Sequence, residues 1–131
     1  PQVTNTGKKD AYVYLEVTLP KATVITANDD GTKNEAANVA LFSYKTNENW
    51  KELTSQKRED DHSVTYVYAY EKVLQPSQVT NPLFNEVALI NLVEGQLVET
   101  TQNIEVVAKA IQADSTGTIE EAYIKLANQN Q

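Results

Sequence analysis

The sequence predicts a mostly β protein: an antiparallel β-sandwich of jelly-roll type with one short C-terminal helix near residues 118–127. Two segments, 11–19 and 63–73, alternate apolar and polar side chains, which is typical of half-buried strands. Turn-forming residues separate several such short runs, as in all-β sandwiches and barrels. A chain of 131 residues has room for one domain with a real core, so we expect a single jelly-roll-like domain over residues 1–131.

The first strand is the clearest in the chain. Its apolar face carries Ala11, Val13, Leu15, Val17 and Leu19, and its amphipathic face carries Tyr12, Tyr14, Glu16 and Thr18. Pro20 is expected to end it, because proline cannot donate to a strand ladder. Residues 22–27 form a second β-prone run, and Asn28–Gly31 is typical of a tight turn.

The middle of the chain predicts two further strands. Residues 36–44 are apolar enough for a buried strand, and residues 47–53 form a loop or short strand that packs Trp50 and Leu53 inward. Residues 55–61 are charged and predict a hairpin tip. The segment 63–73 then places its residues on two faces: Val64, Tyr66, Tyr68 and Tyr70 on one, and Thr65, Val67 and Ala69 on the other.

The last third begins with a proline-containing connection over residues 74–82, after which Leu83, Phe84 and Val87 are expected to insert into the core. Residues 88–92 extend as a short strand and residues 94–96 turn. From 103 onward the period is two, with Ile104, Val106, Ala108 and Ala110 on the side expected to be half-buried. After a turn at 114–117 the period becomes helical; Thr118 and Glu121 form a capping box, and the inward face is Ile119, Ala122, Tyr123 and Leu126.

The charge balance excludes some partners. The chain has 11 Lys and Arg against 18 Asp and Glu, a formal net charge of −7, and its single arginine is Arg58. It has no basic stripe to neutralise phosphates, which argues against a nucleic-acid partner, and an anionic membrane surface would repel it. No apolar run is long enough for a membrane helix, so we expect no membrane insertion. The chain begins at Pro1 without methionine, which predicts a removed leader or a trimmed chain.

The catalytic inventory is nearly empty, and we expect neither enzymatic activity nor a cofactor. The chain has no cysteine and one histidine, His62, whose neighbours Asp60 and Asp61 fit a solvated hairpin tip better than a weak metal site. Asn28–Gly31 suggests calcium, but the EF-hand spacing fails because Ala37 stands at the position of the bidentate acid. The better account is a turn, so we expect no metal.

Three segments of the chain carry motifs that can be compared with a known family. They are P-Q-V-T-N-T-G-K-K-D-A-Y-V-Y-L-E-V (1–17), L-Q-P-S-Q-V-T-N-P-L-F-N-E-V (74–87) and I-E-V-V-A-K-A-I-Q-A-D (104–114), the last followed by E-E-A-Y (120–123). In this order they resemble the TasA/camelysin family of exported Gram-positive proteins. The family shows a "vtNtG…aYVr" strand, a "tpLFd-V" segment and an "AiQa…eAw" close in this order. Tyr123 stands where an aromatic residue, often tryptophan, is usual, and the middle from Thr23 to Asp61 diverges.

The resemblance implies a secreted jelly-roll domain in the extracellular matrix or at the cell surface, often a subunit of biofilm fibres. It also implies that a leader and a first β segment, which family members usually carry before the proline matching Pro1, are missing here. Its partners would be other copies of itself or a related matrix protein, joined by donor-strand exchange, in which an extended segment completes a neighbour's sheet. The expected assembly segment is Pro1, Gln2, Val3, Thr4, Asn5 and Thr6, with Val3 entering a groove. The metalloprotease activity implied by the name camelysin has no ligand set here.

A surface adhesin or binding module is the alternative function. It would use exposed tyrosines such as Tyr66 and Tyr68, within a set that also includes Tyr12, Tyr14 and Tyr70. Tyrosine equally suits the half-buried strands of a sandwich core, and this is the interpretation that we favour.

Overall fold

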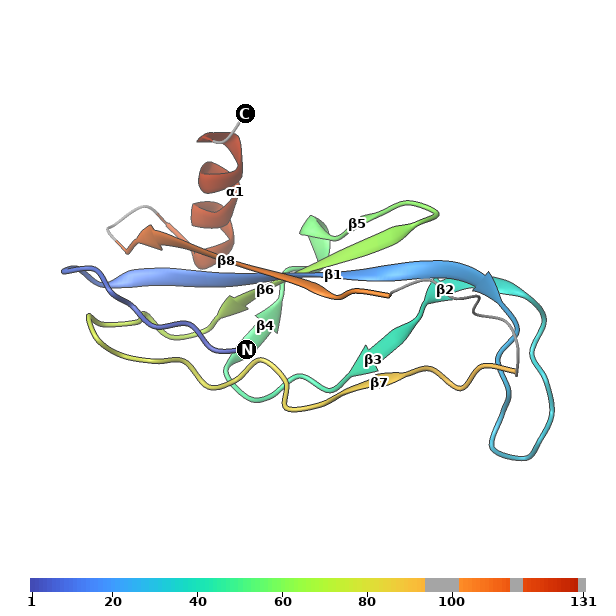
Figure 1. Cartoon of the computed structure of the whole chain (residues 1–131). Coiled ribbons are helices and arrows are strands. Elements are labelled where there is room, and N and C mark those ends of the chain that lie inside the picture. Colours follow the sequence, from blue (N-terminus) through green and yellow to red (C-terminus); the bar gives the residue numbers. More distant parts are fainter. Residues whose placement is uncertain (94–101, 114–116, 130–131) are drawn as a thin grey trace.

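Ten elements follow one another along the chain in the computed structural model, which describes residues 1–93, 102–113 and 117–129 (Figure 1). Most of them are strands, and the sheets are antiparallel, which confirms the mostly β class. The elements are β1 (Ala11–Val24), β2 (Ala37–Ala40), β3 (Phe42–Tyr44), β4 (Trp50–Glu52), the 3-10 helix η1 (Thr54–Gln56), β5 (Arg58–Glu59), β6 (Ser63–Tyr70), β7 (Val87–Leu89), β8 (Glu105–Gln112) and α1 (Ile119–Gln129).

Strand β1 is the centre of a six-stranded sheet. One side of β1 pairs with β6, and the other side pairs first with β8 and then with β2. Beyond β6 lie β4 and β5. The second sheet described is the two-stranded pair β3–β7. The structure is therefore an antiparallel β protein with two layers of sheet.

Pro20 does not end the first strand, contrary to the sequence prediction. Strand β1 continues to Val24 and so includes part of the run 22–27 that we predicted as separate. The N–H of Lys21 donates to the carbonyl of His62, so the backbone of Lys21 faces β6. Backbone groups alternate in direction along a strand, so the backbone of Pro20 faces the opposite side. On that side β8 stops at the partner of Thr18 and β2 begins at the partner of Lys21. Pro20 thus lies in the gap between two partners, where no donor is needed.

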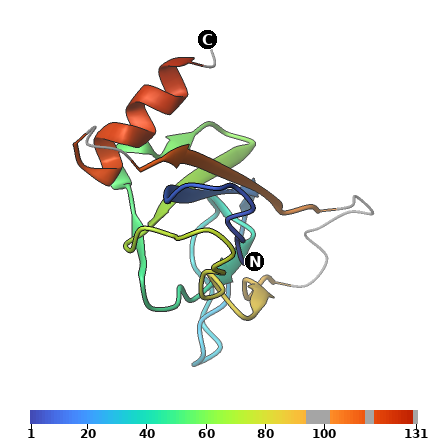
Figure 2. The same cartoon turned by 90° about the vertical axis from the view of Figure 1, so that its left-hand side faces the viewer.

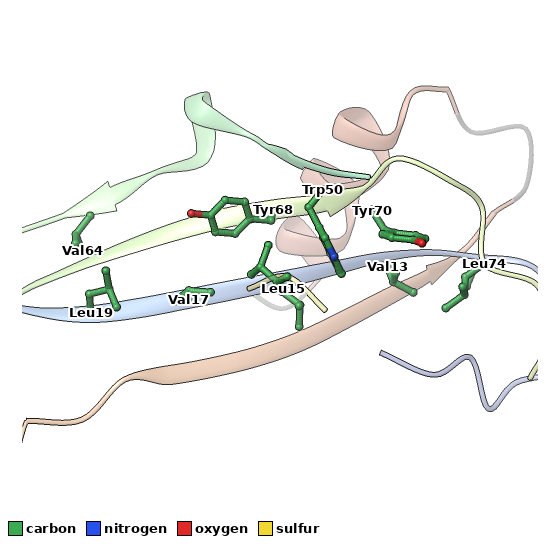
Figure 3. Packing of buried hydrophobic residues seen from close by; sticks show 11 residues of the cluster. Val13, Leu15, Val17, Leu19, Trp50, Val64, Tyr68, Tyr70 and Leu74 are labelled. Carbon is green, nitrogen blue, oxygen red and sulfur yellow. The ribbon is translucent and has the colours of Figure 1, made fainter. Parts of the chain in front are cut away.

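The main core lies on the face of the large sheet that is turned toward β3 and β7. Side chains of β1, β4 and β6 meet there (Figure 3), and Phe42, Tyr44, Phe84 and Val3 pack against them from the second layer and the N-terminus. Leu83 is fully buried, which confirms its predicted insertion. The buried members of this cluster are Ala11, Val13, Leu15, Val17, Leu19, Trp50, Val64, Tyr68, Tyr70, Leu74 and Leu83.

Helix α1 covers part of the opposite face. Figures 1 and 2 show it on the side of the large sheet away from β3 and β7. Tyr14, Leu53, Val67, Ala69 and Tyr123 form a second buried cluster there. The capping box is confirmed: the Thr118 hydroxyl accepts from the N–H of Glu121 at 3.1 Å, and the Glu121 carboxylate accepts from the N–H of Thr118 at 3.4 Å. All four predicted inward residues of α1 are buried or half-buried.

Two other predictions need correction. The segment 36–44 is not one buried strand; it breaks at the buried Leu41 into β2 and β3, which belong to different sheets. The face of β8 predicted as half-buried is largely exposed from Val106 to Ala110, because β8 lies at the rim of the sheet, and only Ile104 packs on the main core. The turns predicted at 94–96 and 114–116 lie outside the described residues.

Candidate functional site

The predicted assembly segment, Pro1–Thr6, lies alongside residues 77–83 of its own chain. Thr4 pairs with Val79 in an antiparallel bridge. The N–H of Asn5 donates to the carbonyl of Gln78 at 3.0 Å, and the N–H of Thr80 donates to the carbonyl of Val3 at 2.9 Å. The segment therefore already occupies a strand-like position in the second layer.

Buried polar side chains hold this segment at both ends. Thr80 is 2% exposed, and its hydroxyl accepts from the N–H of Val3 at 3.0 Å. The amide of Asn5 donates to the carbonyls of Lys9 and Leu74, both at 2.8 Å, and its oxygen accepts from the N–H of Gly7 at 2.9 Å. Asn5 is thus fully satisfied while buried, which is the condition for burying an amide without penalty. Val3 packs on the main core of its own chain.

The outer edge of β8 is the second feature of interest. In the described part of the chain β8 pairs with β1 alone. The N–H of Ala113 donates to the carbonyl of Asp10, so odd-numbered residues of β8 turn their backbone N–H and C=O groups toward β1. Even-numbered residues turn these groups outward. Val106 and Val107 are 39% and 48% exposed. Residues 105–112 contain no proline, a residue that commonly blunts such an edge.

Glu16 is a charged residue buried within the fold. It lies on the helix-covered face of β1 and is 6% exposed. One carboxylate oxygen accepts from the Arg58 guanidinium at 3.1 Å. The other accepts from the Lys109 ammonium at 3.0 Å and from the Tyr123 hydroxyl at 2.6 Å. One carboxylate thereby ties β1 to β5, β8 and α1.

The electrostatics of this cluster favour the ionised carboxylate. Burial opposes the charge on Glu16, but hydrogen bonds from Tyr123, Lys109 and Arg58 outweigh it and lower the pKa of Glu16 below its usual value. Burial, followed by the adjacent carboxylate, raises the pKa of Tyr123, so this hydroxyl stays a donor. Both oxygens of Glu16 are engaged by donors, and the arrangement favours a structural clamp over proton transfer.

Sequence reasoning missed this cluster. It assigned Glu16 to the amphipathic face of the first strand and singled out Arg58 only as the sole arginine. The four residues are far apart in the chain and share no motif spacing. The one available signal was a glutamate in the middle of a strand whose neighbours on the same face are tyrosine and threonine, where a buried charge needs a partner.

The tyrosines fill the core, as we favoured from the sequence. Tyr14, Tyr68 and Tyr70 are at most 6% exposed, and Tyr66 is half-buried. The hydroxyls of Tyr44 and Tyr68 lie 2.7 Å apart across the two layers. Burial raises the pKa of Tyr44 to about 12, so both groups are neutral at ordinary pH. A ligand-binding face that needs Tyr68 at the surface is not available.

The other polar loops form turns. The Asp60 carboxylate accepts from the N–H groups of His62 and Ser63 at 2.7 and 2.8 Å, which closes the hairpin tip. Gly31 has a φ of +88° in the turn predicted at 28–31. Among the described residues no group of three or more His, Cys, Asp or Glu side chains gathers as a metal site. In the same part of the chain no helix is long and apolar enough to span a membrane.

Comparisons with models of known protein families, with curated proteins and with solved structures find no match for this chain.

Proposed function

We propose that this protein is a structural subunit that joins other copies of itself, or a related matrix protein, by β-strand addition. The observation that carries the proposal is the seat of Pro1–Thr6: an extended terminal segment held along residues 77–83 chiefly by main-chain bonds. Backbone pairing gives affinity in strand addition, and side-chain pockets give register. Val3 packs against the core and Asn5 lies in a buried site, so these two side chains can set the register.

Exchange of this segment between copies is inexpensive in free energy. If the segment of one copy leaves its seat and the segment of a neighbour enters it, the same hydrogen bonds and the same apolar contacts form again. The cost is confined to the loss of freedom on association and to any strain in residues 7–10, which join the segment to β1. Repeated head to tail, this exchange gives an open chain of subunits, which is a fibre.

The proposed setting is extracellular: a secreted fibre subunit of a biofilm matrix or a cell surface. Its basis is the resemblance of segments 1–17, 74–87 and 104–123 to the TasA/camelysin family. The second of these segments contains the seat of the first, so two of the three motifs meet in one contact.

Cysteine pairs at the bridge of Thr4 and Val79 test the exchange. The chain has no cysteine of its own, and both positions are exposed. The backbone bonds flank this pair, so it is a non-hydrogen-bonded antiparallel pair, whose short Cα separation suits a disulfide. Thr4→Cys and Val79→Cys chains are mixed under mild oxidation and run on a non-reducing gel, with assemblies followed by electron microscopy.

The proposal expects a disulfide-linked heterodimer from this mixture. Thr4→Cys mixed with Ser43→Cys, an exposed position in β3, is the control and should stay unlinked. The double variant Thr4→Cys/Val79→Cys, oxidised as a monomer, should lock the segment in its own seat and lose fibres until it is reduced. No linkage above the control, or fibres from the locked chain, would contradict the exchange.

A further inference from the structure

We propose that the outer edge of β8 is a two-fold interface, at which β8 of one copy pairs antiparallel with β8 of a second copy. This inference concerns a surface different from the seat of Pro1–Thr6 and does not depend on the exchange proposed above. It joins two six-stranded sheets into one continuous sheet. The partner is fixed by the sequence of the edge itself, which is complementary to its own reverse.

Backbone geometry limits the registers that such a pair can adopt. The even-numbered residues of β8 turn their N–H and C=O groups outward, so residues of even number must face each other as hydrogen-bonded pairs. With the two-fold axis at Val107, Val106 faces Ala108 of the second copy. Val107 then faces its own counterpart as a non-hydrogen-bonded pair, and all of these side chains are exposed in the single chain.

Charge selects this register among the allowed ones. With the axis at Val107, Glu105 lies opposite Lys109 of the second copy, and symmetry makes the pair occur twice. Moving the axis to position 105 or 109 sets glutamate against glutamate or lysine against lysine, which is destabilising. Moving it to position 106 or 108 sets Glu105 against an apolar residue, Val107 or Ile111. Only the central register, with the axis at Val107, combines two opposite-charge pairs with an apolar centre.

The other residues that the structure describes leave room for this pairing. Helix α1 packs near Ile111, at the C-terminal end of β8. In the central register Ile111 lies opposite residue 103 of the second copy, so the two helices are offset by roughly 27 Å along the strands. That offset exceeds the diameter of a helix. Lys109 keeps its contact with Glu16 while its 29% exposed side chain meets the carboxylate of Glu105 from the second copy.

A cysteine at position 107 tests both the partner and the register. In Val107→Cys the two thiols face each other across the axis, within the range for a disulfide. In the matched control Val106→Cys, each thiol faces Ala108 and its counterpart lies two residues away, beyond that range. Both valines are exposed, so neither substitution should disturb the fold. The yield of linked dimer is read on a non-reducing gel after incubation in a glutathione buffer.

The proposal expects Val107→Cys to cross-link at least about tenfold more than Val106→Cys.

A second test changes a charge at the interface. Glu105→Lys places two lysine–lysine pairs across the interface and should weaken dimer association about tenfold, as measured by sedimentation. Glu35→Lys makes the same charge change at an exposed loop position and should not. Equal cross-linking of the two cysteine variants, a monomer at all concentrations, or equal effects of the two lysine variants would overturn the interface. The Thr4 and Val79 cross-link reports the N-terminal exchange separately.

Discussion

The side chain of Glu16 connects four elements, β1, β5, β8 and α1. Its removal should weaken the contacts among them and destabilise the fold. We expect Glu16→Ala to lower the free energy of unfolding by about 2 kcal/mol, because Lys109, Arg58 and Tyr123 lose a charged acceptor while the first two still reach water. Tyr123→Phe removes one donor only and should cost about 1 kcal/mol. Urea unfolding followed by the fluorescence of Trp50 measures both. An equal or larger loss in Tyr123→Phe would contradict this ranking.

The same carboxylate should make stability depend on pH. The pKa of Glu16 is lower in the folded protein than the usual value of 4.5, so the native state binds fewer protons than the unfolded state across that interval. Its contribution is therefore present above the unfolded pKa and is lost as the pH falls through the folded one. Acidification from about pH 6 to about pH 3 should destabilise the wild type more than Glu16→Gln.

Unfolding midpoints in urea at the two pH values give the comparison. The exposed carboxylates of Asp30, Glu59 and Asp60 also have lowered pKa values and remain in both proteins, so they serve as a common background. Parallel losses of stability in wild type and Glu16→Gln would show that Glu16 does not titrate as the geometry implies.

At the scale of elements, the start of α1 depends on its capping box. Thr118→Ala removes the oxygen that accepts from the N–H of Glu121, and we expect it to cost about 1 kcal/mol. Lys125→Ala, at an exposed position in the same helix, is the control and should change stability by less than about 0.5 kcal/mol. Thermal unfolding followed by circular dichroism distinguishes the two. Equal effects would mean that the cap does not limit the helix.

The accuracy of sequence reasoning also differs between elements. Local signals were sufficient for α1, whose cap and inward face are both encoded within ten residues, and for β6, whose two faces alternate as predicted. They failed for Pro20 and β8, because the outcome there depends on which strand lies alongside. The strand passes Pro20 only because its neighbours change there, and the apolar side of β8 stays exposed because β8 forms a rim.

The same distinction between local signals and long-range contacts applies to the candidate sites. The sequence indicated Pro1–Thr6 as an extended segment, since its pattern is local, and the entry of Val3 into a groove during assembly stays a prediction. Its seat at 77–83 and the Glu16 cluster bring together residues far apart in the chain, and no spacing predicts such contacts. The tyrosine face was ambiguous for a physical reason: the same residue type serves a half-buried strand and a binding surface.

At the scale of the whole molecule, the two layers should unfold together. Leu83 comes from the second layer and is completely buried in the main core. Leu83→Ala should therefore lower the free energy of unfolding by about 2–5 kcal/mol. Leu89→Ala, at a residue of β7 that is 50% exposed, should cost much less. Coincident transitions by Trp50 fluorescence and by circular dichroism are expected, and separate transitions would show that the layers unfold independently.

The length of β1 has a consequence for how the chain acquires its fold. During synthesis β1 emerges early, yet β6 follows about fifty residues later and β8 about ninety. One flank of the central strand, over residues 11–18, therefore stays unpaired until β8, the last strand described, has been made, and such distant pairings form slowly. Until β8 arrives, residues 11–18 expose a sheet edge to every other nascent copy. A cell that makes this protein has reason to complete, or to guard, each chain before neighbouring copies meet.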